Sequence, residues 1–402
     1  MDIRFTEAEI AFRDELRSWL GAVLPTLGDP PGRDDWASRR EWDTGWQRML
    51  YDAGYAGVNW PSEFGGRGST PTEHLIFLEE TTRMGAPYVG MNFVAQLHAG
   101  PTLILEGTAE QQARHLPAML KGEEVWCQGF SEPNAGSDLA SLSTRAVRDG
   151  DHYVVTGQKI WTSFGHVADY CELLVRTDPE APKHRGITWL ICPMDLPGIE
   201  VRPIATVAGA SEFCEVFFDE VRIPAGNRVG DENDGWRVAM VTFSFERGTA
   251  FISELLGTMN QLAEMADLAR STPRSGPFAR HDGSAWDDDD VRREIGRLQA
   301  EYDALWALTK RVVSQAQRTG MPGPGGSVFK LYYADVKKRM ADLAHRMLGR
   351  EALVLAEGGD EQTGGDMVAS RLYVLSLSIA AGTSEIQRNI IGERILGLPK
   401  ER

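Results

Sequence analysis

The sequence predicts an α+β protein with an N-terminal helical domain, a middle antiparallel β-barrel or sandwich, and a C-terminal four-helix bundle. Hydrophobic residues recur with helical spacing in the first and last parts of the chain. Between them lie short β-branched or aromatic runs separated by Gly and Pro. No long amphipathic helix interrupts these runs, which favours antiparallel over parallel pairing. We expect domain boundaries at residues 1–122, 123–234 and 235–402.

The N-terminal segment carries several helix-start signals. Thr6 and Glu9 have the spacing of a capping box, and apolar residues follow at helical intervals. Further helices are predicted over residues 71–84, where a proline suits the first turn, and over 108–120, where the first threonine can cap.

The middle segment contains alternating or β-rich runs that predict strands. These runs cover residues 152–157, 170–175, 187–191 and 215–218. All four cysteines, Cys127, Cys171, Cys192 and Cys214, fall in this segment without metal-binding spacing. We expect them to be reduced, buried thiols with no catalytic role.

The last segment returns to helical periodicity. Four long helices are predicted, over residues 240–269, 289–319, 328–357 and 367–379. The acidic run at 287–290 suggests either a metal site or a solvated loop whose last aspartate caps the next helix. We favour the loop because four consecutive side chains do not converge on one ion.

Composition excludes several function classes. The chain has 402 residues, 42% of them hydrophobic, and a formal net charge of −16, which argues against a nucleic-acid or anionic-membrane surface. No apolar run approaches the roughly 20 residues that span a bilayer. Residues 1–7 lack the basic and apolar regions of a signal peptide, so we expect a cytoplasmic protein.

Three motifs carry a family resemblance. They read GFSEPNAGSD at residues 129–138, GQKIWTS at 157–163 and AAGTSEIQR at 380–388. Short hydroxyl residues and glycine suit the polar edge and phosphates of a flavin, and an aromatic plate suits its ring. Together the motifs resemble the flavin-contacting signatures of the acyl-CoA dehydrogenases, and the helix–strand–helix order matches that family along essentially the whole chain.

The resemblance implies FAD as cofactor. The residues that it assigns to FAD are Gln128, Phe130, Ser131, Gly136, Ser137, Trp161, Thr162, Ser163, Thr383 and Glu385. It assigns Ser137 and Arg247 to substrate binding. No metal is implied.

The same resemblance raises a question about the catalytic base. Most members have a glutamate directly before the Gly-Thr of the third motif, where this chain has Ala381. Some members place the glutamate on a bundle helix, directly before an arginine, and Glu246-Arg247 fits that pattern. Phe243 and Phe245 offer an apolar setting that would raise a carboxyl pKa. The competing interpretation of Glu246-Arg247 is an ordinary surface pair on an amphipathic helix.

The resemblance implies α,β-dehydrogenation of an acyl-CoA thioester to the trans-2-enoyl-CoA in fatty acid or lipid metabolism. Glu246 would remove the α-proton and flavin N5 would accept the hydride. An electron-transfer flavoprotein would be the electron acceptor, and a homotetramer or dimer the expected assembly. Two alternatives stay open: a subunit of a heterotetrameric enzyme, as in sterol side-chain breakdown, and a catalytically silent CoA-binding homologue.

Overall fold

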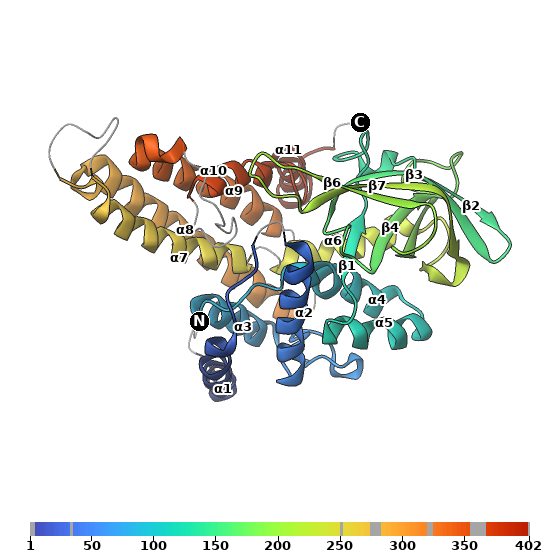
Figure 1. The fold of residues 1–402 in the computed structure, drawn as a ribbon, viewed down its shortest axis with the longest axis horizontal. Helices are drawn as coiled ribbons and strands as arrows, with labels where there is room; N and C mark the ends of the chain where they lie inside the picture. Colours follow the sequence, from blue (N-terminus) through green and yellow to red (C-terminus); the bar gives the residue numbers. More distant parts are fainter. Residues whose placement is uncertain are drawn as a thin grey trace.

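The computed structural model describes residues 5–32, 35–249, 252–273, 283–319, 325–353 and 367–400. The side chains of residues 246–249 lie outside the described part. Figure 1 shows three regions: a sheet at one end, long helices reaching away from it, and the N-terminal helices packed below both. The predicted helix–strand–helix order and α+β class are confirmed.

Five α-helices form the N-terminal region. They are α1 (Glu7–Val23), α2 (Trp36–Asp52), α3 (Pro71–Arg83), α4 (Gly100–Glu106) and α5 (Ala109–Lys121). The predicted capping box of Thr6 and Glu9 is present at α1. The predicted helices at 71–84 and 108–120 correspond to α3 and α5, each begun by a threonine capping box. A single π-helical turn, η4 (Ala95–Ala99), precedes α4.

One sheet forms the middle region. Its strands are β1 (Trp126–Gly129), β2 (Arg145–Asp149), β3 (His152–Ser163), β4 (Tyr170–Arg176), β5 (Ile187–Pro193), β6 (Ile199–Ile204), β7 (Phe213–Pro224) and β8 (Arg228–Val229). The strand order is β6-β7-β3-β2-β4-β5-β8, with β1 beside β4. The predicted strands lie within β3, β4, β5 and β7. Pairing is mainly antiparallel, but β1 and β2 both meet β4 in parallel. The four cysteines are buried free thiols, as predicted.

The C-terminal region is helical. It consists of α6 (Gly235–Thr249), α7 (Ile252–Ser271), α8 (Asp289–Thr319), α9 (Gly325–Leu348), α10 (Met367–Tyr373) and α11 (Ser384–Ile390). Apolar residues of α7, α8 and α9 share one core. No helix in the described ranges has both the length and the apolar character to cross a membrane.

Two predicted helices end early. The helix expected to reach residue 357 stops at Leu348, because Gly349 adopts a left-handed backbone with φ 58°. The rest of that expected helix, residues 354–357, lies outside the described residues. The helix expected to reach residue 379 stops at Tyr373. There the hydroxyls of Ser376 and Ser378 bond to carbonyls three residues back and compete with helix continuation.

The acidic run at 287–290 is a loop and a helix start. The prediction that its last aspartate caps the next helix is wrong. Asp288 accepts the N–H of Asp290 at 2.8 Å, whereas Asp290 lies in the first turn of α8 and pairs with Arg293. Among the described residues no group of His, Cys, Asp or Glu could hold a metal ion.

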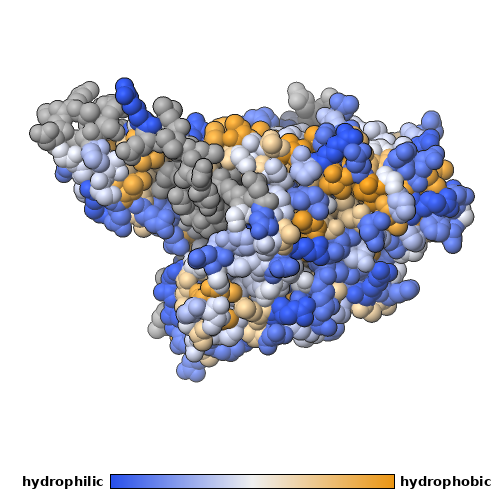
Figure 2. All heavy atoms as spheres, viewed as in Figure 1, coloured by the Kyte–Doolittle hydropathy of each residue, from blue (hydrophilic) through white to orange (hydrophobic). Residues whose placement is uncertain are grey.

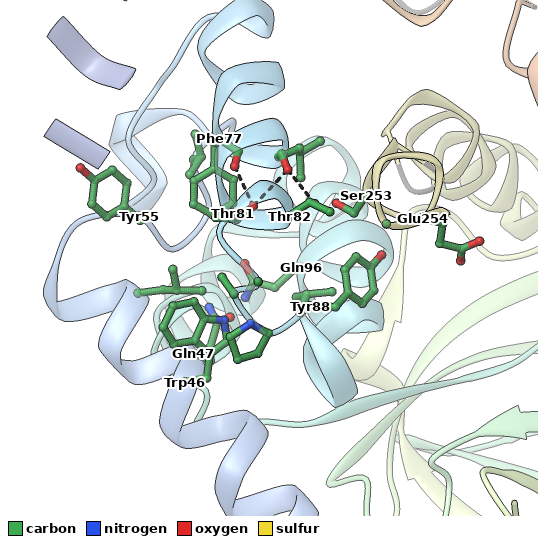
Figure 3. A pocket seen from close by; sticks show the side chains of 18 of the residues that line it. Trp46, Gln47, Tyr55, Phe77, Thr81, Thr82, Tyr88, Gln96, Ser253 and Glu254 are labelled. Carbon is green, nitrogen blue, oxygen red and sulfur yellow. Dashed lines mark hydrogen bonds between the residues drawn. The ribbon is translucent and has the colours of Figure 1, made fainter. Parts of the chain in front are cut away.

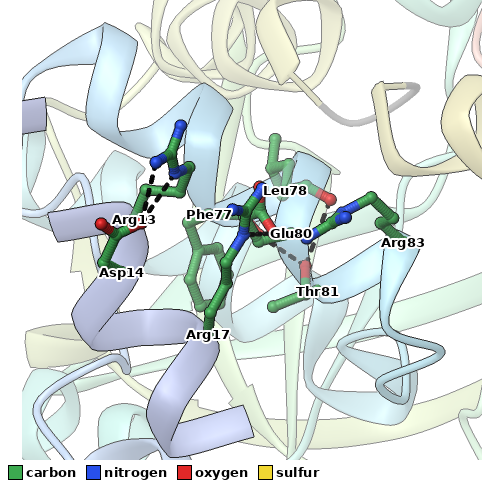
Figure 4. A network of polar contacts seen from close by, with 8 residues as sticks. All are labelled: Arg13, Asp14, Arg17, Phe77, Leu78, Glu80, Thr81 and Arg83. Carbon is green, nitrogen blue, oxygen red and sulfur yellow. Dashed lines mark hydrogen bonds and ion pairs between the residues drawn. The ribbon is translucent and has the colours of Figure 1, made fainter. Parts of the chain in front are cut away.

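A buried carboxylate fixes α3 against α1. Arg17 of α1 donates two hydrogen bonds of 2.7 Å to Glu80, and Arg83 adds a third at 2.6 Å (Figure 4). Glu80 is only 4% exposed. Burial alone would raise the pKa of its carboxyl, but the two guanidinium groups outweigh burial and lower it.

Replacing this carboxylate tests its contribution. We expect Glu80→Gln to lower the free energy of unfolding by about 1–3 kcal/mol at pH 7, the usual range for hydrogen bonds to charged groups. A carboxyl with a lowered folded-state pKa stabilises above its ordinary value of about 4.3 and loses this effect as pH falls through the folded value. The difference between variant and wild type in urea unfolding should therefore shrink below about pH 4. A difference that stays constant with pH would contradict this assignment.

Candidate active site

The first two motifs meet at the end of β1. The N–H of Ile160 donates to the carbonyl of Ser131 at 2.9 Å, and Lys159 Nζ donates to the carbonyl of Phe130 at 3.1 Å. Phe130 is buried, whereas Ser131 keeps part of its surface exposed. The two motifs are thus joined by one main-chain contact and one side-chain contact.

A buried ion pair holds this junction. Lys159 is fully buried and its Nζ lies 2.8 Å from Glu132 Oε1. The Glu132 carboxylate also accepts hydrogen bonds from the N–H groups of Ser143 and Thr144, at 2.7 and 2.8 Å. Burial alone would raise the pKa of Glu132, but Lys159 and these donors lower it to about 2. The sequence patterns assign no role to Glu132, although this glutamate lies within the first motif.

Trp161 stands in a β-bulge. The register of β3 against β7 shifts between Lys159 and Thr162, and Trp161 has a φ of 62°. Its indole is 56% exposed and touches Phe213 edge-on. A large aromatic residue in the left-handed region is uncommon, and bulges frequently re-aim side chains at functional sites. The bulge therefore presents a flat apolar face outside the sheet.

The neighbouring hydroxyls differ in exposure. Thr162 is fully buried, and its Oγ1 has no hydrogen-bond partner in the described part of the chain. Ser163 is partly exposed. On the other motif, Gly136 and Ser137 lie on an exposed turn. A Cβ built on Gly136 would meet no protein atom within 4 Å, so packing within the described chain does not require a glycine there.

The Gln128 side chain points into the protein. Its Nε2 lies 2.7 Å from Glu172 Oε1 and 3.2 Å from His98 Nδ1. His98 belongs to η4, so this contact ties η4 to β1. Any contact of Gln128 with a cofactor would therefore be made by the backbone of Gln128.

The third motif is held from within and from α9. Thr383 caps α11 by accepting the N–H of Ile386 at 3.2 Å. Lys330 donates to the carbonyl of Gly382 at 2.5 Å, and Gln387 donates to that of Ala381 at 3.0 Å. Ala381 has a φ of 51°, so this turn is left-handed at a non-glycine residue. These contacts fix the turn without joining it to the first two motifs.

Glu385 makes none of these contacts. Glu385 is exposed and pairs with Arg388 at 3.1 Å. Phe243 of α6 packs edge-on against Phe130, with ring centroids 5.7 Å apart. Residue 246 follows one helical turn later. The side chains of Glu246 and Arg247 lie outside the described residues, so only their place on α6 is fixed.

A cavity of about 630 Å³ lies between α2, α3 and the first half of α7 (Figure 3). Its lining combines aromatic residues, among them Trp46, Trp60 and Phe77, with polar residues from α2, α3 and α7. Gln96 of η4 also lines it, and the same turn reaches β1 through His98. No local pattern in the sequence predicts the cavity, because its lining comes from segments far apart in the chain.

The described residues fit a flat, anionic cofactor at the junction. The exposed indole of Trp161 offers a stacking surface, and the open turn at Gly136 offers N–H groups without a side chain in the way. The hydroxyl of Ser163 lies two residues from that indole and is partly exposed.

Removing one charge from the buried pair tests its role at the junction. We expect Glu132→Gln to cost about 3–5 kcal/mol of unfolding free energy, because Lys159 is left buried without its counter-charge. The double change Glu132→Leu with Lys159→Met removes both charges and should recover most of this loss. Urea unfolding followed by tryptophan fluorescence measures both. If the single and double variants lose equal stability, the ion pair is not what holds the junction.

Three family models match the chain in order. They describe the acyl-CoA dehydrogenase N-terminal domain at residues 6–123, the middle domain at 127–221 and the C-terminal domain at 233–396. Acyl-CoA dehydrogenase IpdE1 of Mycobacterium tuberculosis is 38% identical over 97% of this chain and 98% of its own. Acyl-CoA dehydrogenase FadE26 of the same organism is 34% identical over 100% and 99%.

Solved structures agree. A chain of the ChsE4-ChsE5 complex from M. tuberculosis superposes with a TM-score of 0.81, at 32% identity, over 100% of both chains. A chain of the Tcur3481-Tcur3483 steroid ACAD gives 0.81 at 30% identity, also over 100% of both. Members of this family are FAD-dependent oxidoreductases that act on acyl-CoA. The chain belongs to the acyl-CoA dehydrogenase family, with FAD as its cofactor.

Proposed function

We propose that the protein catalyses FAD-dependent α,β-dehydrogenation of an acyl-CoA thioester to the trans-2-enoyl-CoA, with Glu246 as the base. The observation that carries this proposal is the contact between Phe243 of α6 and Phe130 of the first motif. It brings the turn of α6 that bears residue 246 close to the junction of β1 and β3.

FAD would be held by the residues of the three motifs. Trp161 would stack beside its ring, and Ser131 and Ser163 would meet its polar edge with hydroxyl and N–H groups. Gly136 and Ser137 suit its phosphates, with Thr383 and Glu385 assigned to the same cofactor. When bound, FAD supplies a hydride acceptor for the β-hydrogen.

The chain's own residues would manage the α-proton. A thioester α-proton is only weakly acidic, so its removal needs a carboxylate freed from water and a raised carboxyl pKa. Phe130 and Phe243 provide apolar surface next to the proposed position of the base. Arg247 would orient the substrate without carrying a proton. Ala381, in place of the more usual glutamate, leaves the second position without a base.

Replacement of the proposed base gives a direct test. We expect Glu246→Gln to keep stoichiometric FAD and its yellow colour but to lose substrate-dependent bleaching of the flavin by at least a hundredfold, in the range set by general-base catalysis. Anaerobic stopped-flow absorbance measures the bleaching rate. The matched control is Glu110→Gln, an exposed glutamate in the first turn of α5, which should bleach like wild type. Wild-type bleaching in Glu246→Gln would assign the base elsewhere.

A second candidate is a subunit of a heteromeric acyl-CoA dehydrogenase. Two structural relatives are named as complexes of two different chains. Figure 2 shows apolar surface along the edge where Figure 1 places α9 to α11. Exposed apolar side chains in the C-terminal residues include Leu375, Ile379, Leu396 and Leu398. Such a surface suits another subunit, either identical or related.

Purification of the chain alone separates the two assemblies. Stoichiometric FAD with turnover would contradict the heteromer. A colourless protein that gains flavin on mixing with a second chain would support it. Tight acyl-CoA binding without any flavin spectrum would favour a catalytically silent homologue. An electron-transfer flavoprotein is the proposed acceptor for the reduced enzyme.

A further inference from the structure

A buried lysine holds the turn of the third motif from α9. Lys330 is 4% exposed, and its Nζ donates to the carbonyl of Gly382 at 2.5 Å. Figure 1 places α9 beside α11, the helix that follows this turn, and the two helices pack against each other. An ammonium is costly to bury unless hydrogen bonds compensate it. The proposed reaction makes no use of this lysine, so its burial calls for another role.

A second buried side chain holds the same turn. Gln387 is 1% exposed, and its Nε2 lies 3.0 Å from the carbonyl oxygen of Ala381 and 3.3 Å from that of Gly382. Gly382 has a φ of 87°, and a Cβ built on it would come within 2.8 Å of this Nε2. A glycine therefore suits both the left-handed backbone and the close approach of Gln387. Together, Lys330 and Gln387 fix the direction of two successive carbonyls.

The direction of these carbonyls decides where the next N–H groups point. The described chain has no cis peptide bond, and in a planar trans peptide the C=O and the following N–H point in opposite directions. The N–H of Thr383 shares its peptide unit with the carbonyl that Lys330 holds, so it points away from Lys330. This N–H donates no hydrogen bond within the described part of the chain, and Thr383 is partly exposed. The turn therefore presents a backbone donor on its side away from Lys330.

The charge of Lys330 also strengthens this donor. A hydrogen bond to the carbonyl of a peptide unit polarises that unit, and an ammonium does so more strongly than a neutral donor. The effect requires no contact between Lys330 and a ligand. A methionine at position 330 would remove the charge and the hydrogen bond, while Gln387 would still donate to the Gly382 carbonyl. Such a change therefore leaves no buried carbonyl without a partner.

We propose that Lys330 is a positioning residue for FAD: it orients and polarises the peptide unit between Gly382 and Thr383, whose N–H donates to an acceptor oxygen of the cofactor. This inference rests on the assignment of Thr383 to FAD, which belongs to the proposed function. FAD has acceptor oxygens on its phosphates, its ribityl chain and its ring, and a backbone N–H suits any of them. The competing role is a structural lysine that only ties α9 to the turn.

A double-mutant cycle separates these two roles. Thr383→Pro removes the N–H and Thr383→Ala keeps it, while both lose the capping hydroxyl, and proline suits the φ of −58° at this position. Equilibrium dialysis of each FAD-loaded protein against graded FAD concentrations gives the Kd for FAD. We expect Lys330→Met to raise this Kd by at least about tenfold in the Thr383→Ala background, the effect of one charge-assisted hydrogen bond. In the Thr383→Pro background the same change should alter the Kd by less than about twofold, because no N–H remains to be oriented.

Lys337→Met is the matched control. Lys337 lies on the same helix, two turns further on, and is equally buried at 4% exposed. No hydrogen bond in the described ranges joins it to the third motif, so its replacement should leave the Kd for FAD unchanged. Far-UV circular dichroism and size-exclusion chromatography verify that every variant is folded. Any partner chain that flavin binding requires is included throughout.

Each outcome decides one point. If Lys330→Met leaves the Kd for FAD unchanged in the Thr383→Ala background, Lys330 only ties α9 to the turn and the proposal is overturned. If it raises the Kd equally in both backgrounds, Lys330 acts by a route that excludes the Thr383 N–H, and the proposal is again wrong. Equal Kd values for Thr383→Pro and Thr383→Ala would also overturn it. Failure of the proposed function would look different: the wild type would bind FAD, but no acyl-CoA would bleach its flavin.

Discussion

The buried ion pair between Lys159 and Glu132 is the constraint on which the rest of the site depends. One fully buried ammonium binds a carboxylate at 2.8 Å and a carbonyl of the first motif at 3.1 Å. The carboxylate in turn collects backbone N–H groups from the start of the segment that leads into β2. The ion pair and its hydrogen bonds therefore connect three separate segments of the chain, at residues 130–132, 143–144 and 159. A misplaced partner would leave an uncompensated charge in the interior.

The bulge in β3 and the first motif are both arranged around this ion pair. β3 has a bulge directly after the buried Lys159, between Lys159 and Thr162, and this bulge presents Trp161 to the outside. The short main-chain contact between Ile160 and Ser131 keeps the first motif against this bulge. On the inner side, η4 and α3 enclose the aromatic cavity, and the arginine-bound Glu80 secures α3 from behind.

Local sequence signals predict the fold well where the stabilising interactions join residues that are close in sequence. The capping boxes at Thr6 and Thr108 appear as expected because a cap needs only residues three apart. Hydrophobic periodicity does not predict the early end of α10. The reason is that serine hydroxyls that hydrogen-bond to the preceding backbone leave no periodic pattern in the sequence. The motifs also indicated which segments meet, and hydrogen bonds between residues 130–132 and 159–160 confirm that the first two do. The roles of individual motif residues toward FAD stay predictions.

Long-range features could not be predicted in this way. In the sequence Glu132 is only one residue of the first motif. Its structural role is visible once the fold brings Lys159 of β3 against it. Glu254 of α7 and Lys337 of α9 have all of α8 between them in the sequence, so no local pattern marks them as lining one cavity. Trp161 was assigned a stacking role by resemblance, but its left-handed backbone and exposure depend on pairing with β7. Each case depends on tertiary contacts between distant elements.

In the proposed mechanism α6, and not the turn at Ala381, supplies the base. The most direct measurement is exchange of the α-hydrogen with D₂O, followed by mass spectrometry, on an acyl-CoA analogue whose β-position cannot be oxidised. This isolates proton removal from all later steps. The FAD-loaded wild type should incorporate deuterium at the α-carbon, and the Glu246→Gln protein should not. Equal incorporation by both proteins would show that Glu246 is not the base.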